Sequence, residues 1–132
     1  MGKLRHIAVT AADPEAAAQF YEKTFDMERV RESKLGMLLS DGTVSLAILR
    51  FPDDKTAGDE RGKDFFGLHH MGFVVDDLKA AGEAIESNGG RYHMKIPSRE
   101  HADTEVKFRD PNGVVFDVVT DDYAKEFWKA KV

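Results

Sequence analysis

An internal repeat constrains the fold of this chain more than any other feature of its sequence. Residues 4–26 align without a gap on residues 68–90, and such self-similarity is typical of a duplicated supersecondary unit. Identical pairs include Leu4 and Leu68, His6 and His70, Asp13 and Asp77, Ala16 and Ala80, Ala17 and Ala81, and Glu22 and Glu86. The repeat therefore predicts two halves of the same architecture.

Each half has the pattern of a strand, a helix and three further strands. Apolar runs at the start of each half predict the first strands, over 4–11 and 68–75. Asp13 and Asp77 are suited to cap the helices that follow. The later strands are expected over 28–33, 36–40 and 43–50 and over 91–96, 104–109 and 114–120, with hairpin turns at "DG" (41–42) and "DPNG" (110–113).

These elements predict an α+β fold built from two tandem βαβββ modules. The modules are expected over residues 3–50 and 67–120, with a polar linker over 51–66 and a C-terminal helix over 121–131. One domain then spans residues 1–132, because the chain is too short for two ordinary domains. Each sheet has a helix on one face only, so we expect two curved sheets to cover each other and enclose a shared cavity.

The alternation of side chains along a strand decides which histidines face that cavity. His6 shares a face with Ala8, and His70 shares the matching face with Gly72. Ala8 and Gly72 are small and are expected to leave open space, so we predict that they line a substrate site beside the two histidines. His69 points the other way, and we expect it on the helix side or at the strand end, with no part in metal binding.

The last expected strand carries one carboxylate in apolar surroundings. Asp117 lies in "VVFDVV" (114–119), and a buried aspartate without a partner is costly. A divalent metal ion (Fe, Zn, Mn or Ni) held by His6, His70 and Asp117 is one solution, because imidazole and carboxylate suit such ions. A salt bridge or a hydrogen bond from the backbone is the alternative.

Other polar residues carry weaker signals. His101 lies in the polar loop "PSREHADTE" and is a candidate acid or base, and Tyr92 and Arg99 are candidates for substrate contact. His93 lies on a strand whose facing the pattern does not fix. Aromatic residues on one face of the terminal helix, Tyr123, Phe127 and Trp128, are expected to pack rather than to form a binding site.

Composition excludes several classes of function. Cysteine is absent, so neither disulfides nor thiolate ligands are available. The net charge is −5 without a basic cluster, which argues against nucleic acid as a partner. No apolar run is long enough to span a bilayer, and the N-terminus lacks the pattern of a secretory signal. We therefore expect a cytoplasmic protein with a small-molecule substrate and no membrane or nucleic-acid partner.

Three stretches in order resemble the vicinal oxygen chelate (VOC) superfamily. They are "LRHIAVTAADPEAAAQFYEKTF", "LHHMGFVVDDLKAAGEAI" and "FRDPNGVVFDVV". This superfamily includes glyoxalase I, bleomycin- and fosfomycin-resistance proteins, methylmalonyl-CoA epimerase and extradiol dioxygenases. The resemblance implies two βαβββ modules around a cavity, with metal ligands on the first and last strand of each module.

Carried over to this chain, the family pattern implies His6, His70 and Asp117 as ligands and puts the fourth position near Leu46, which cannot bind a metal. The resemblance implies a metal-dependent enzyme that binds a small substrate through vicinal oxygens, either dioxygenase-like or glyoxalase/lyase-like. A metal-free protein that binds a small molecule or an antibiotic, of the bleomycin-resistance type, is the alternative. A homodimer is expected in either case.

Overall fold

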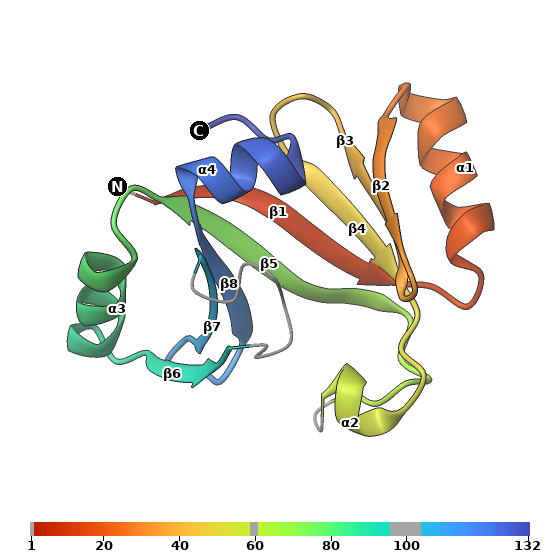
Figure 1. The fold of residues 1–132 in the computed structure, drawn as a ribbon. Coiled ribbons are helices and arrows are strands. Elements are labelled where there is room, and N and C mark those ends of the chain that lie inside the picture. The colour runs from red at the N-terminus through yellow and green to blue at the C-terminus, as the bar shows by residue number, and fades with distance from the viewer. Residues whose placement is uncertain (1, 59–60, 96–103) are drawn as a thin grey trace.

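The computed structural model describes residues 2–58, 61–95 and 104–132. Its α+β architecture is one curved, open sheet of eight strands in the order β2-β3-β4-β1-β5-β8-β7-β6 (Figure 1). The predicted fold class is confirmed, with one difference in detail. The two modules do not contribute separate sheets, because β1 and β5 pair antiparallel at the centre and join them into one.

The first module contains β1 (Lys3–Thr10), α1 (Pro14–Phe25), β2 (Glu28–Ser33), β3 (Gly36–Ser40) and β4 (Ser45–Leu49). Asp13 caps α1 by accepting a hydrogen bond from the Ala16 amide at 3.1 Å. Pro14 occupies the first turn, where its missing N–H costs nothing. The helix ends where Asp26 adopts a left-handed conformation with φ 57°.

The second module repeats this order with β5 (Gly67–Val75), α3 (Leu78–Ser87), β6 (Arg91–Met94), β7 (Glu105–Arg109) and β8 (Val115–Thr120). Asp77 caps α3 through the Ala80 amide at 3.0 Å, as Asp13 caps α1. In each module the first and last strands pair in parallel, β1 with β4 and β5 with β8. The repeat in the sequence is therefore a repeat in the strand pairing as well.

The two faces of the sheet bury different clusters. Helices α1 and α3 cover one face, and beneath them lie two separate apolar clusters, one under each helix. The opposite face carries a third cluster that includes Ala8, Ala47 and Val74 of the sheet and Trp128 of the C-terminal segment. The side chains of β1 and β5 that the alternation assigned to the cavity, His6 and His70 among them, lie on this second face.

Two short helical segments lie outside the modules. Helix α2 (Asp54–Ala57) is a single turn capped by Asp53, within the segment that the sequence predicted only as a polar linker. After β8 the chain forms α4 (Asp121–Tyr123), which continues as a π-helical turn over Ala124–Trp128 and crosses the open face of the sheet (Figure 1). Among the described residues, no helix has the length and apolar character needed to cross a membrane.

Candidate metal centre and its cavity

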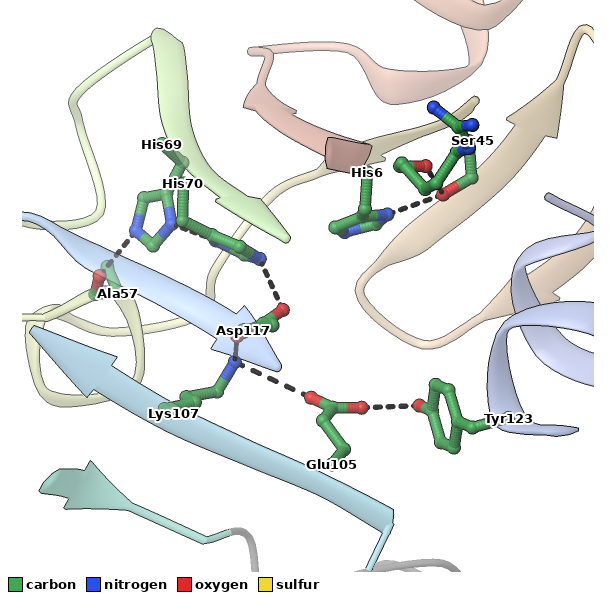
Figure 2. A network of polar contacts seen from close by, with 10 residues as sticks. His6, Ser45, Ala57, His69, His70, Glu105, Lys107, Asp117 and Tyr123 are labelled. Carbon is green, nitrogen blue, oxygen red and sulfur yellow. Dashed lines mark hydrogen bonds and ion pairs between the residues drawn. The ribbon is translucent and has the colours of Figure 1, made fainter. Parts of the chain in front are cut away.

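Three strands bring the predicted ligands together. His6 comes from β1, His70 from β5 and Asp117 from β8, and each offers a ligand atom within 4.8 Å of the other two (Figure 2). The strand registers explain this meeting, because Gly72 of β5 pairs with His6 on one side and with Asp117 on the other. His6 and Asp117 are buried, with exposed fractions of 5% and 3%.

The ring of His6 is held on both sides and is neutral. Its Nδ1 lies 2.6 Å from the hydroxyl of Ser45, and that hydroxyl in turn donates to the backbone oxygen of Arg5 at 3.4 Å. The hydroxyl therefore accepts from Nδ1–H of His6, which leaves a lone pair on Nε2. Trp128 stacks on the ring at 4.4 Å. Burial lowers the pKa of His6 from 6.5 to about 3, with smaller contributions from nearby charges.

A chain of hydrogen bonds also fixes the ring of His70. The Nδ1 of His70 lies 2.8 Å from Nδ1 of His69, and Nε2 of His69 lies 2.6 Å from the carbonyl oxygen of Ala57 (Figure 2). Burial lowers the pKa of His69, so its ring is neutral near pH 7. Because a carbonyl oxygen only accepts, His69 donates through Nε2 and accepts through Nδ1 from His70. Nδ1 of His70 is therefore occupied, and Nε2 is the ring nitrogen left to face the ligand cluster.

That Nε2 faces the carboxylate of Asp117 at 3.1 Å. The second carboxylate oxygen lies 2.5 Å from Nζ of Lys107. Burial would raise the pKa of Asp117, but the positive charge of Lys107 and the contacts with His70 outweigh it and hold this pKa well below its usual range. Asp117 is therefore ionised and has a cationic partner within the protein, which was the second possibility considered for it.

Lys107 belongs to a longer series of polar contacts that was not predicted from the sequence. Its Nζ lies 3.5 Å from Glu105, and Glu105 accepts a short hydrogen bond from the hydroxyl of Tyr123 on the C-terminal segment (Figure 2). A signal was present in the sequence. The "DPNG" hairpin sets the pairing of β7 and β8, and counting back from that turn places Lys107 opposite Asp117.

The residues present suit a divalent cation. Both imidazoles have their Nδ1 atoms committed to hydrogen bonds, and Nε2 of His70 faces a carboxylate oxygen of Asp117. Such outer hydrogen bonds to the second ring nitrogen are a regular feature of metal-binding histidines. Without metal, a proton on Nε2 of His70 bridges to the carboxylate of Asp117 at 3.1 Å, and a bound cation would take the place of that proton.

The fourth position of the repeat is Ala47. Ala8 of β1 pairs with Ala47 of β4 just as Gly72 of β5 pairs with Asp117 of β8. The expected position near Leu46 came from aligning Gly42 with Gly113, and it is one residue off because two residues separate Gly42 from β4 but only one separates Gly113 from β8. Leu46 instead packs with the cluster under α1. Ala47 lines the cavity and offers no ligand atom, so the first module contributes only His6.

The three ligands open into a cavity of about 860 Å³. Its walls differ in chemistry. The first module contributes apolar side chains, such as Leu38 and Leu49, whereas the second contributes His70, Lys107 and Asp117. The linker supplies a further wall, which the sequence reading did not assign to the site. That wall includes Phe51, Lys55, Thr56, Ala57, Gly58 and Arg61.

The small residues beside the histidines, Ala8 and Gly72, make room for a protein side chain and not for a substrate. Ala8 is fully buried in the cluster that contains Trp128. A Cβ at Gly72 would lie 2.7 Å from the indole ring and 3.0 Å from Cβ of His6. Neither Ala8 nor Gly72 lines the cavity. The space they leave is filled by Trp128, which stacks on His6 and forms one wall of the site.

Of the weaker candidates that the structure describes, Tyr92 and His93, only His93 lines the cavity. Tyr92 is 51% exposed, lies against Phe108 at 6.2 Å and is not among the residues that line the cavity. Its neighbour His93 lines the cavity instead, with its Nδ1 accepting from Arg109 at 3.4 Å. Arg99 and His101 lie outside the described residues.

Comparisons with known proteins agree with this architecture. The sequence profile of the Glyoxalase/Bleomycin resistance protein/Dioxygenase superfamily matches residues 3–118. The chain belongs to this superfamily. A comparison with curated protein sequences finds no match.

Solved structures show the same fold. Methylmalonyl-CoA epimerase from Mycobacterium tuberculosis is 23% identical, with a TM-score of 0.68 over 89% of this chain and 86% of the epimerase. A variant of the Streptomyces coelicolor epimerase in complex with 2-nitronate-propionyl-CoA is 24% identical, with a TM-score of 0.70 over 89% and 96%. A variant of 4-hydroxymandelate synthase from Streptomyces coelicolor is 16% identical, with a TM-score of 0.63 over 90% and 48%.

Proposed function

We propose that this chain is a divalent-metal-dependent enzyme in which His6, His70 and Asp117 hold the ion. One observation carries the proposal. Both imidazoles are fixed by hydrogen bonds at Nδ1, and they and a buried carboxylate bring ligand atoms within 4.8 Å of one another. The resemblance to the VOC superfamily favours Fe, Zn, Mn or Ni and a reaction that is either dioxygenase-like or glyoxalase/lyase-like.

A bound divalent ion would supply Lewis acidity to two adjacent oxygens of a substrate. Three protein ligands leave coordination positions for those oxygens. Lys107 places an ammonium group beside Asp117, where it neutralises charge and can donate a hydrogen bond to a substrate oxygen. The apolar wall formed by Leu38, Ala47 and Leu49 would contact the hydrocarbon part of the molecule and exclude water from it.

The charge of the cavity lining favours an anionic substrate. Arg31, Lys55 and Arg61 line the cavity, and within the described ranges none of them forms an ion pair. Arg31 lies over the ring of Phe127 at 5.3 Å and Arg61 over that of Phe65 at 4.5 Å. Cations held against aromatic rings in this way remain available to a carboxylate or phosphate. We therefore propose a small, oxygenated and negatively charged substrate.

Cobalt titration tests the metal site. The protein is purified without a His-tag or a chelator, and Co²⁺ binding is followed by visible absorption and by quenching of Trp128, the one tryptophan of the chain. We expect one Co²⁺ per chain in the wild type and a loss of affinity by orders of magnitude in His70→Ala, because a ligand is removed. His93→Ala, which changes a cavity histidine outside the cluster, is the matched control and should bind like the wild type.

The metal-free alternative makes the opposite prediction. A binding protein of the bleomycin-resistance type would take up no stoichiometric Co²⁺, and His70→Ala and the wild type would then behave alike. In that case the contacts between His70, Asp117 and Lys107 would be purely structural, and metal-dependent catalysis would be rejected.

We also propose that the chain forms a homodimer, as expected from the resemblance. Light scattering at tens of micromolar should then report twice the chain mass of 14.8 kDa. A value of 14.8 kDa would reject the dimer. The three candidate ligands and the Trp128 ring that stacks on His6 come from the same chain.

A further inference from the structure

We propose that His69 is a positioning residue for the metal site: it accepts a hydrogen bond from Nδ1 of His70, fixes the orientation of that ring and connects it to the linker. This inference rests on the proposed function. It replaces the expectation that His69 takes no part in metal binding, which followed from the alternation of side chains alone. His69 does point away from the ligands, but its ring lies at the strand end, where it reaches Nδ1 of His70.

The direction of each hydrogen bond follows from the anchor of the chain. The carbonyl oxygen of Ala57 can only accept, and at 2.6 Å it takes a proton from Nε2 of His69. In the neutral ring of His69, Nδ1 then accepts, so Nδ1 of His70 donates across 2.8 Å. Nδ1 of His70 is thereby occupied, and the ring is turned so that Nε2 faces Asp117 at 3.1 Å.

The repeat explains why the second module needs this arrangement. In the first module Ser45, opposite His6 on the parallel strand β4, orients the histidine through its hydroxyl. The pairing of Ile7 with Leu46 matches that of Met71 with Phe116, so the residue equivalent to Ser45 is Val115. Valine has no hydrogen-bond acceptor in its side chain. His69 therefore performs for His70 the task that Ser45 performs for His6.

The anchor of this relay lies in the segment between the modules. Ala57 is the last residue of α2 and is 3% exposed, so its carbonyl is held firmly within the wall that the linker adds to the cavity. Phe51 of the same segment lies against the ring of His69 at 4.9 Å. A backbone carbonyl of the linker thus helps to orient the proposed ligand His70, because it holds the ring of His69 in place.

The test compares Co²⁺ dissociation constants for the wild type and three variants, measured by Trp128 quenching. His69→Ala removes the acceptor and should weaken binding by about 10- to 100-fold, as is typical for residues that orient a ligand. His69→Gln restores one acceptor and one donor and should recover most of the affinity. Leu68→Ala changes an adjacent side chain that is 67% exposed and should bind like the wild type. Affinity in His69→Ala within twofold of the wild type would overturn the inference.

A second measurement is independent of the metal. Long-range proton–nitrogen correlation spectra of the metal-free wild type report which ring nitrogen of each histidine is protonated. We expect a proton on Nδ1 of His70 in the wild type, and a shifted Nδ1 signal of His70 in His69→Ala. A wild-type spectrum with no proton on Nδ1 of His70 would contradict the relay. If the wild type binds no Co²⁺, the proposed function fails, and these spectra alone still decide whether His69 fixes His70.

Discussion

His6 shows how burial of a single side chain couples folding to pH. The folded protein holds this ring neutral, with its pKa lowered from 6.5 to about 3 by burial. The unfolded chain binds a proton at pH values where the folded one does not. Stability from this group is therefore complete above pH 6.5 and is lost progressively as the pH falls toward 3.

We predict a shallower pH dependence when His6 is replaced by a residue that does not titrate. Between pH 6.5 and 5, the metal-free wild type should lose about 2 kcal/mol more than His6→Gln in its free energy of unfolding, at about 1.4 kcal/mol per pH unit. Urea unfolding at pH 7, 6 and 5 with excess chelator measures both slopes, and the difference between them isolates His6. Equal slopes would show that His6 is protonated as readily in the folded protein as in the unfolded chain.

The residues of the site differ in how far the sequence could predict them. His6 and His70 could be paired from the repeat, and Asp117 could be found as a carboxylate in an apolar strand. Lys107 escaped because its importance depends on the register of a hairpin, and His69 because alternation predicts facing but not the reach of a side chain at a strand end. For both residues, the sequence does not show the contact that matters, which is made with a different strand or segment.

The starts of the two long helices could be predicted from the sequence, whereas the end of the short C-terminal helical segment could not. Asp13 and Asp77 predict the starts of α1 and α3, because a capping side chain bonds to a backbone amide only three residues away. The C-terminal helix was expected to continue to residue 131, but it ends at Trp128, where Lys129 adopts a φ of 50°. That end lets Trp128 reach His6, which lies far from it in the sequence. No local pattern could show that Gly72 makes room for this ring.

Gly72→Ala tests the contact between the C-terminal segment and the sheet. The new Cβ would lie 2.7 Å from the ring of Trp128, so the ring and with it His6 must shift. Overpacking of this kind should lower the free energy of unfolding by about 1–3 kcal/mol, and the fluorescence of Trp128 should change. Urea unfolding followed by fluorescence measures both effects.

Gly82→Ala is the matched control for that substitution. Gly82 lies within α3, where an added Cβ makes an ordinary contact of 3.6 Å with Phe108. Alanine in a helix interior should raise stability by up to about 1 kcal/mol. If Gly72→Ala were as stable as this control, the close packing of Trp128 on β5 would be contradicted.

At the scale of the whole molecule, the two halves share one fold but differ in the side chains that they place at equivalent positions of the cavity. Lys107 and Asp117 face each other across β7 and β8, and the equivalent pair across β3 and β4 is Leu38 and Ala47. At this position, β7 and β8 thus carry a charged pair where β3 and β4 carry an apolar one. The symmetry of the backbone was visible in the sequence, whereas the asymmetry of the cavity depends on single residues within it.

This asymmetry makes Ala47 the place where a fourth ligand can be restored. Ala47→Asp puts a carboxylate at the repeat equivalent of Asp117, on a strand position that is 7% exposed and lines the cavity. Without metal, the new charge is buried and lacks the lysine that Asp117 has, so stability should fall by about 3 kcal/mol or more. With Co²⁺, the added ligand should raise metal affinity by at least about tenfold, since ligand charge and number set affinity.

Thermal unfolding with and without Co²⁺ measures both effects in one experiment. The increase in Tm on adding Co²⁺ should be larger for Ala47→Asp than for the wild type, because the ion binds the folded state more tightly and also neutralises the buried charge. Ala47→Asn has nearly the same size without the charge and should show an increase close to that of the wild type. Equal increases for the aspartate and asparagine variants would mean that position 47 does not face the ion, and the proposed correspondence of Ala47 with Asp117 would then fail.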